Sequence, residues 1–269
     1  MANEVVTRQP TGIASYLNSD AAKDNIMSVV GEKDTARFIS SVVSAVQTTP
    51  ALQKCTKASI LNAALLGHAL NLSPSPQLAM YYMVPYKNKG TDEAQFQLGW
   101  KGYVQLAIRS GQYRRIVASE VREGEIKEFN PITEEFRLDP VLDVQKRESL
   151  PVVGYYAMLE LMNGFRKEIY WTKEKMSSHA IQYSKGYASD IKNGNSYTFW
   201  SKNFDDMAKK TMLRQLISKW GIMSIDMQQA FESDMAVIDA DGNKRYVDNT
   251  DYEPEVENPF SSEVIIDEQ

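Results

Sequence analysis

Basic and aromatic side chains stand close together in the segment QLGWKGYVQLAIRSGQYRRI, residues 97–116. Its cations and rings are Lys101, Arg109, Arg114, Arg115, Trp100, Tyr103 and Tyr113. Cations at intervals can contact successive phosphates, and flat rings can stack on unpaired bases. The segment therefore indicates a nucleic-acid groove, with a solvated basic helix face as the alternative.

A second segment of the same kind is SYTFWSKNFDDMAKKTMLRQLISKW, residues 196–220. Its candidate residues are Trp200, Lys209, Lys210 and Arg214. Lys210 and Arg214 are four residues apart, so a helix of 3.6 residues per turn places both on one face, which we expect to be solvent-exposed. The alternative is ordinary surface charge, with Trp100 and Trp200 in the core.

These two segments supply the candidate DNA contacts. We expect phosphate contacts from Lys101, Arg109, Arg114, Arg115, Lys209, Lys210 and Arg214. We expect base-stacking or wedge roles for Tyr103, Tyr113 and Trp200. Phosphate contacts carry no sequence information, so such a surface binds DNA without sequence preference.

An enzymatic site is not apparent from the sequence. The single cysteine, Cys55, and the two histidines, His68 and His179, are too scattered for a zinc site, and no Gly-rich phosphate loop occurs. The adjacent carboxylates at 134–135 and 205–206 diverge on a strand or helix rather than converge on a metal. We therefore expect no catalytic residues, no metal and no cofactor. A metal-dependent nuclease remains the enzymatic alternative.

The charge of the chain is unevenly distributed. Its formal net charge is −5, yet residues 239–269 hold ten Asp or Glu and two Lys or Arg. Removing that net −8 leaves +3 for residues 1–238. A basic body with an acidic tail is a weak indication of nucleic-acid contact. The tail could solubilise the protein, compete with DNA, or recruit a partner through ENPFSSEVII.

The cysteine content and hydropathy indicate a cytoplasmic location. No apolar run approaches the roughly 20 residues of a membrane span, and the N-terminus lacks the pattern of a secretory signal. One cysteine cannot form an intramolecular disulfide, which suits a reducing compartment.

The periodicity of apolar residues predicts an α+β fold, a small antiparallel sheet with hairpins backed by helices. Helices are expected near 19–30, 32–49, 56–72, 100–110, 172–186, 204–219 and 225–233, and strands near 78–86, 94–100, 113–123, 134–138, 152–162 and 165–171. Asn163-Gly164 is a strong hairpin signal. Residues 1–16 and 186–200 are expected to be irregular.

Three regions are expected along the chain. Residues 1–32 form an arm and short helix, 33–234 a nucleic-acid-binding core, and 235–269 an acidic disordered tail. The apolar stripes of the two helices between 17 and 50 exceed what a small sheet can cover. They therefore predict self-association, with packing inside one chain as the alternative.

Four stretches resemble the RecT family of phage and prophage single-strand annealing proteins. They are LGHALNLSPSPQLAMYYMVPY, QLGWKGYVQLAIRSG, VREGE and MAKKTMLRQLISKW, found in this order within roughly residues 35–225. The N-terminal region and the acidic tail fall outside the resemblance.

The resemblance implies ATP-independent annealing of complementary DNA strands in phage homologous recombination. It implies binding of single-stranded DNA and annealed duplex by a homo-oligomer, a ring or helical filament, inside the bacterial host. It also implies a phage-type 5′→3′ exonuclease partner, allows contact with a host single-strand binding protein, and suggests a fold related to the lambda Red annealing protein. A single-stranded nucleic-acid coating protein that does not anneal is the alternative.

Overall fold

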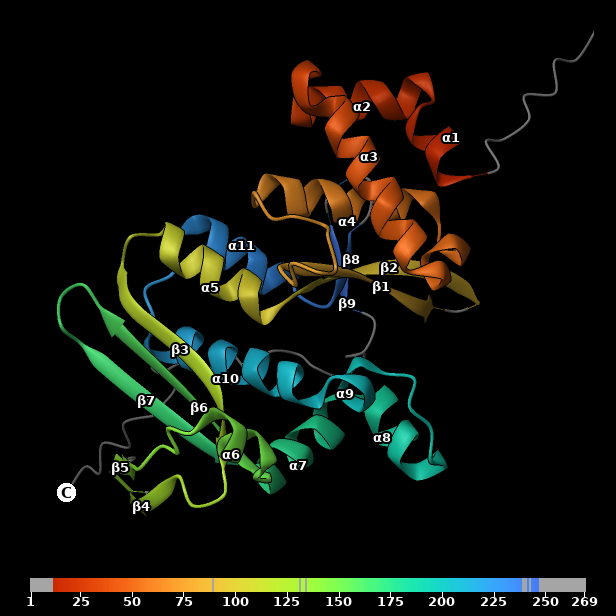
Figure 1. Ribbon diagram of the computed structural model, residues 1–269. Helices are drawn as coiled ribbons and strands as arrows, with labels where there is room; N and C mark the ends of the chain where they lie inside the picture. The colour runs from red at the N-terminus through yellow and green to blue at the C-terminus, as the bar shows by residue number, and fades with distance from the viewer. Residues whose placement is uncertain are drawn as a thin grey trace, which may run out of the picture.

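The computed structural model describes residues 12–88, 90–130, 132–133, 135–238, 241 and 243–246 (Figure 1). Its helices are α1 (Ile13–Leu17), α2 (Asp20–Val30), α3 (Glu32–Thr48), the 3-10 helix η1 (Pro50–Lys54), α4 (Lys57–Ala69), α5 (Trp100–Arg109), α6 (Val144–Ser149), α7 (Lys173–Tyr183), α8 (Lys185–Asn193), α9 (Phe199–Lys202), α10 (Phe204–Trp220) and α11 (Ile225–Ser233). Its strands are β1 (Tyr81–Asn88), β2 (Thr91–Leu98), β3 (Tyr113–Arg122), β4 (Ile126–Asn130), β5 (Glu135–Leu138), β6 (Val152–Leu161), β7 (Arg166–Thr172), β8 (Ala236–Ile238) and β9 (Lys244–Tyr246). All strand pairs are antiparallel, so the predicted α+β class is confirmed.

The first sheet has the strand order β1-β2-β8-β9 and lies under the N-terminal helices. The predicted hairpin is present, with Tyr81 opposite Leu98 at its base. Helix α4 packs on β1, β2 and β8, and α1, α2 and α3 stack above it (Figure 1). The apolar character of α4 on most faces follows from this position between two layers.

The second sheet has the order β3-β6-β7, and α10 packs across its inner face. Side chains alternate along a strand, so Tyr155, Ala157 and Leu159 of β6 all point into the core beneath α10. The β6–β7 hairpin turns at Asn163-Gly164, as predicted. Gly164 has φ +88°, a conformation that side-chain-bearing residues rarely adopt.

Helices α5, α10 and α11 join the two sheets into one structure. Helix α5 contacts α10, α11 and β3, and α11 also contacts β2 and β8. The GWKG motif explains the close fit of α5. A Cβ added to Gly99 or Gly102 would lie 2.1 Å from the backbone oxygen of Ala79 or Met80, respectively.

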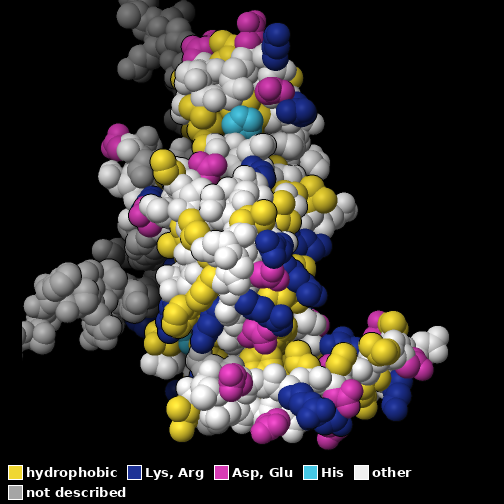
Figure 2. Space-filling model, turned by 90° about the vertical axis from the view of Figure 1, so that its left-hand side faces the viewer, with side chains coloured by type: hydrophobic (Ala, Val, Ile, Leu, Met, Phe, Trp, Pro, Cys, Tyr) yellow, Lys and Arg dark blue, Asp and Glu magenta, His cyan; other side chains and the backbone are white. Residues whose placement is uncertain are grey.

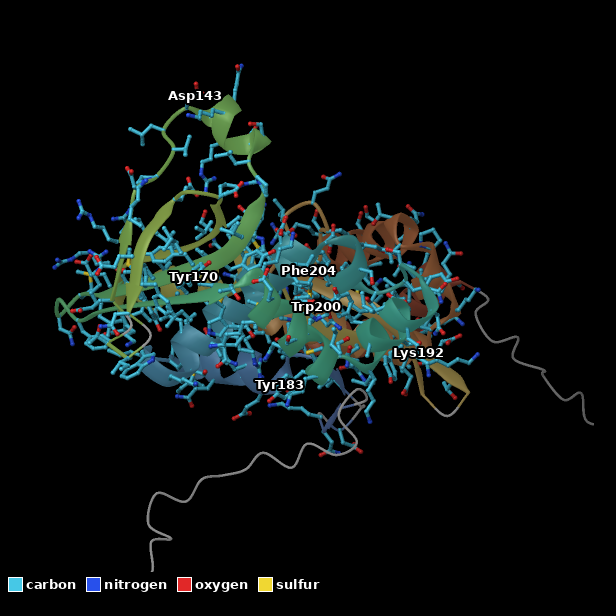
Figure 3. The ribbon with its side chains drawn as sticks, turned by 90° about the horizontal axis from the view of Figure 1, so that it is seen from below. Asp143, Tyr170, Tyr183, Lys192, Trp200 and Phe204 are labelled. Carbon is cyan, nitrogen blue, oxygen red and sulfur yellow. The ribbon has the colours of Figure 1, made fainter. Side chains whose placement is uncertain are left out.

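The segment from 123 to 150 projects from the second sheet. It holds β4, β5 and α6, and the view from below places Asp143 at its far end (Figure 3). Glu125 anchors its base. This buried carboxylate accepts hydrogen bonds from the Arg122 amide at 2.7 Å and from Arg147 Nε at 2.6 Å.

Three predictions about irregular regions are wrong. Helix α1 begins at Ile13, α8 occupies Lys185–Asn193, and β8 and β9 continue the first sheet past residue 234. Helix α8 is polar in composition, but Ser184 caps it by accepting a bond from the Tyr187 amide, and Tyr187 and Asp190 are buried. The remainder of the predicted tail, residues 247–269, lies outside the described residues.

The N-terminal apolar stripes are covered within the chain. Ile26 and Val30 of α2 and Ile39 and Val42 of α3 are all buried in the core. Packing inside one chain, the alternative, accounts for these four residues, because α2 contacts α3 and α4, and α3 also contacts α1. Val29, which is 50% exposed, lies on the outer side of α2.

Candidate nucleic-acid interface

The ten candidate DNA contacts do not form one continuous surface. Lys101, Arg109, Arg114 and Arg115 are exposed, Lys209 and Arg214 are half-buried, and Tyr103, Tyr113, Trp200 and Lys210 are buried. They fall into a buried network, a lysine pair at the start of α5, and arginines at the end of α5 and on β3.

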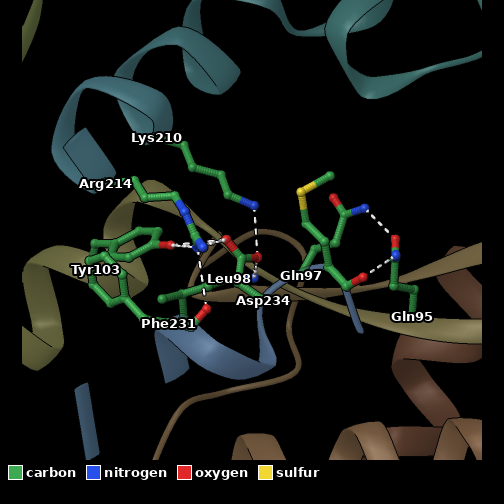
Figure 4. A network of polar contacts seen from close by, with 9 residues as sticks. Gln95, Gln97, Leu98, Tyr103, Lys210, Arg214, Phe231 and Asp234 are labelled. Carbon is green, nitrogen blue, oxygen red and sulfur yellow. Dashed lines mark hydrogen bonds and ion pairs between the residues drawn. The ribbon is translucent and has the colours of Figure 1, made fainter. Parts of the chain in front are cut away.

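The buried network is centred on Asp234, which follows α11 (Figure 4). Lys210 Nζ lies 2.9 Å from Asp234 Oδ1, and Arg214 lies 3.1 Å from Oδ2. The Tyr103 hydroxyl and the Leu98 amide each donate to the same carboxylate at 2.9 Å. Burial opposes ionisation of Asp234, but Lys210 and Arg214 outweigh it and lower its pKa.

Lys210 is 6% exposed, so the expectation of a solvent-facing Lys210–Arg214 pair is wrong for Lys210. The spacing does place both residues on one side of α10, as predicted, but Asp234 covers that side. Arg214 keeps 42% of its side chain exposed while donating to the Phe231 carbonyl at 3.3 Å. Most of the contacts of Lys210 and Arg214 are therefore explained by a structural role.

The lysine pair flanks the ring of Trp100, the first residue of α5. Lys209 Nζ lies 5.0 Å and Lys101 Nζ 5.7 Å from the ring centroid, both within cation–π range. Lys209 also pairs with Glu120 and Asp206 at 2.9 Å each. Its charge is therefore compensated inside the protein, whereas exposed Lys101 faces solvent.

The arginines occupy two other positions. Arg109, at the end of α5, donates to the Leu70 carbonyl at 2.7 Å, and this neutral acceptor leaves its charge uncompensated. Arg114 on β3 pairs with Glu160 at 3.1 Å. In the described part of the chain the Arg115 side chain has no hydrogen bond or ion pair, so its guanidinium is available for an external anion.

The three candidate stacking rings are core residues. Trp200 packs edge-on against Phe204 with ring centroids 5.3 Å apart, and Figure 3 labels both residues near the middle of the structure. Tyr103 is fully buried, and the Tyr113 hydroxyl donates to the Ile222 carbonyl at 2.8 Å. A base cannot reach these rings, so the core alternative holds for Trp200.

An exposed aromatic pair was missed from the sequence. Phe165 and Trp220, here called the aromatic platform, have ring centroids 6.4 Å apart and an interplanar angle of 27°. They are 40% and 44% exposed, and Lys167 Nζ lies 4.7 Å from the Trp220 ring. The sequence positions of the two residues could have indicated their exposure. Phe165 follows the Asn-Gly turn and Trp220 ends a helix, and rings at such positions need not be buried in the core.

Basic side chains gather on one part of the visible surface. Figure 2 shows Lys and Arg side chains gathered on the body of the molecule above the protruding lower segment, with Asp and Glu interspersed.

Within the described residues, no group of three His, Cys, Asp or Glu side chains could hold a metal ion. No helix of that part is long and apolar enough to cross a membrane.

A cluster of exposed basic side chains is one feature of nucleic-acid-binding proteins. Comparison with known proteins identifies the family. A sequence model of the RecT family matches residues 36–250. The chain therefore belongs to the RecT family, and this membership supports a role in DNA recombination and single-strand annealing.

Two relatives illustrate the similarity. The chain is 38% identical to the uncharacterized protein YqaK of Bacillus subtilis, over 92% of this chain and 78% of that protein. It is 30% identical to Protein RecT of Escherichia coli, over 82% of this chain and 80% of that protein.

Proposed function

We propose that this protein anneals complementary DNA strands without ATP during homologous recombination, as an oligomer on the DNA. The observation that carries the proposal is family membership over residues 36–250, which include both basic–aromatic segments. The exposed cations of α5 and β3 support it, because spaced cations are what a phosphate backbone requires. The protein acts by binding and positioning, and base pairing between the strands supplies the specificity.

The residues proposed to contact phosphates are the exposed cations. Lys101, Arg109 and Arg115 have charge that no carboxylate of the described chain compensates. Arg114 and Lys209 would each exchange part of an internal ion pair for a phosphate, and Arg214 would offer its exposed part. Lys210 and Tyr103 would serve instead to fix α10 against α5 and β2.

Oligomerisation and partners belong to the same proposal. A body of net charge +3 offers each copy few phosphate contacts, so many copies sharing one strand would bind it more tightly than one. The exposed outer side of α2, which includes Val29, is the proposed N-terminal contact. A 5′→3′ exonuclease supplying single strands, a host single-strand binding protein and a cytoplasmic setting complete the proposal.

The test is renaturation of two labelled complementary oligonucleotides without ATP or added metal. We expect the protein to accelerate renaturation, whereas a coating protein would slow it. A nuclease would instead shorten the labelled strands when Mg²⁺ is added. Slower renaturation, or cleavage that a chelator abolishes, would overturn the proposal.

The double variant Lys101→Ala with Arg115→Ala tests the proposed contacts. Its equilibrium constant K for single-stranded DNA is measured at several salt concentrations, and its annealing in the same renaturation assay. Each lost phosphate contact should lower the slope of log K against log salt by about 0.7, so the two together should remove about 1.4. Annealing should weaken for all sequences alike. Lys33→Ala, an exposed lysine on α3, is the matched control and should change neither quantity.

A further inference from the structure

Among the ring pairs of the described residues, the aromatic platform is the pair in which both rings are exposed rather than half-buried or buried. Tyr81 and Phe96 are also stacked, at an angle of 27°, but these rings lie in the core. Phe165 and Trp220 present 40% and 44% of their surface outward at the same small angle. The exposed part of each ring is aromatic surface that another planar group can contact.

Rigid backbone holds both rings. The Phe165 amide donates to Asn163 Oδ1 at 3.0 Å and its carbonyl accepts from the Leu161 amide at 2.8 Å. Trp220 ends α10, and the next amide, Gly221, still donates to the Ile217 carbonyl at 2.8 Å. Rings fixed before binding lose little conformational freedom when a ligand stacks on them.

Cations border the platform. Lys167 lies over the Trp220 ring, with its Nζ 4.7 Å from the ring centroid. Arg114 reaches the same turn, 3.5 Å from the Met162 carbonyl, and its ion pair occupies the nearby carboxylate of Glu160. A ligand with a flat neutral part and an adjoining anion would match rings and cations together.

Exposed apolar side chains near the platform, Met162 and Ile222, would also suit a second protein. A nucleotide joins a planar base to an anionic phosphate, so it matches exposed rings beside the Lys167 ammonium, whereas an apolar peptide segment brings no anion. Stacking tolerates any base because every base has a π-face. The observations therefore favour a nucleotide over an apolar peptide segment.

We propose that Phe165 and Trp220 stack on an unpaired base of single-stranded DNA, with its phosphate beside Lys167 and Arg114. The inference rests on the proposed function, and it adds a base-contacting site to a surface otherwise built for phosphates. A base held there would mark where a strand enters or leaves the protein unpaired.

The experiment compares the affinity of the full-length chain for a thymidine oligonucleotide and for an abasic strand of the same length. Trp220→Leu and Phe165→Leu should each weaken thymidine binding by about 5- to 100-fold and leave abasic binding unchanged. Trp220→Phe should restore most of the loss. Tyr197→Leu removes another exposed ring, 75% exposed, and should have no effect.

Three results would overturn the inference. The first is thymidine affinity within about twofold of wild type in both leucine variants. The second is an equal loss on both strands, which would indicate a structural or phosphate role. The third is loss of self-association in sedimentation without DNA, which would assign the platform to a second copy. If the wild-type chain binds neither strand, the proposed function itself fails. The two substitutions lie on different elements, and retained abasic binding shows that a variant is folded.

Discussion

At the residue scale, the most constrained side chain near the proposed interface is Asp234. Its carboxylate receives donors from β2, α5 and α10, so a single residue ties the end of α11 to three elements. Two of those donors, Lys210 and Arg214, are cations, and one of them is buried. A buried charge is tolerable only while its partner is present.

Removing Asp234 should therefore destabilise the protein strongly. Asp234→Ala leaves the Lys210 ammonium buried without a counter-charge, and we expect a loss of about 3–5 kcal/mol in the free energy of unfolding. Urea denaturation followed by circular dichroism measures it. The control is Asp226→Ala, an exposed acid in the first turn of α11, which should cost about 1 kcal/mol or less. A loss below about 1 kcal/mol for Asp234→Ala would contradict the structural role.

The same network changes how DNA-binding variants of α10 must be read. Lys210→Ala would leave Asp234 with Arg214 as its remaining cationic partner, in a site where Lys210 is 6% exposed. Lost DNA binding in that variant would reflect folding rather than phosphate contact. Lys101 and Arg115 avoid this ambiguity because they are exposed.

At the element scale, Asp190 connects α8 to the start of α9. Its Oδ2 accepts hydrogen bonds from the Thr198 amide at 2.8 Å, the Tyr197 amide at 3.0 Å and the Ser201 hydroxyl at 2.6 Å. This set closes the loop between the helices and thereby places Trp200 in the core. Because the donors favour the charged form, the pKa of Asp190 is lowered to about 2.

This shift predicts how the contribution of Asp190 varies with pH. The folded pKa lies below the unfolded value of about 3.9, so the stabilisation is complete above that value and is lost as pH falls toward 2. The stability difference between wild type and Asp190→Asn should therefore be largest at neutral pH and shrink between about pH 5 and pH 2. Thermal unfolding of both proteins across this range measures it. A difference that stays constant with pH would contradict the assignment.

Local sequence signals predicted the elements that depend on local chemistry. The hairpin at Asn163-Gly164 requires positive φ, and the helix from Thr172 begins where the Thr172 hydroxyl accepts from the Lys175 amide. Helix α8 was missed because its composition is polar, although its Ser184 cap is a local signal, and strand β8 was missed because pairing with a distant strand stabilises it. Strand β8 is three residues long and meets β2 at Phe96 opposite Ala236.

The candidate site was harder to predict for the same reason. Periodicity indicated that Lys210 and Arg214 share a side of α10, but it could not indicate that Asp234, far along the chain, covers that side. Phe165 and Trp220 form a pair only because β7 and α10 pack together. Burial and pairing of such residues are properties of the tertiary structure.

At the scale of the whole molecule, charge is divided unevenly between residues 1–246 and residues 247–269. Residues 247–269 contain eight Asp or Glu and no Lys or Arg, so removing this net −8 would change the chain from −5 to +3. Like charges repel over about 30 Å at 0.01 M salt but only about 8 Å at 0.15 M. The segment should therefore oppose DNA mainly at low ionic strength.

Truncation after Tyr246 keeps β9 and removes only this acidic segment. We expect the truncated protein to bind single-stranded DNA more tightly at low salt, on the order of 10-fold, because net repulsion becomes net attraction. The gain should nearly vanish at physiological salt, and strand annealing should persist. Fluorescence anisotropy at the two ionic strengths measures the effect.

A full-length variant with the eight carboxylates replaced by their amides separates charge from the segment itself. If charge alone opposes DNA, the amide variant should match the truncation at both salt concentrations. If the segment opposes DNA by occupying the binding surface, the amide variant should stay closer to wild type at low salt. Equal affinity of wild-type and truncated protein at low salt would show that these residues do not compete with DNA, and would leave solubility or partner recruitment as their role.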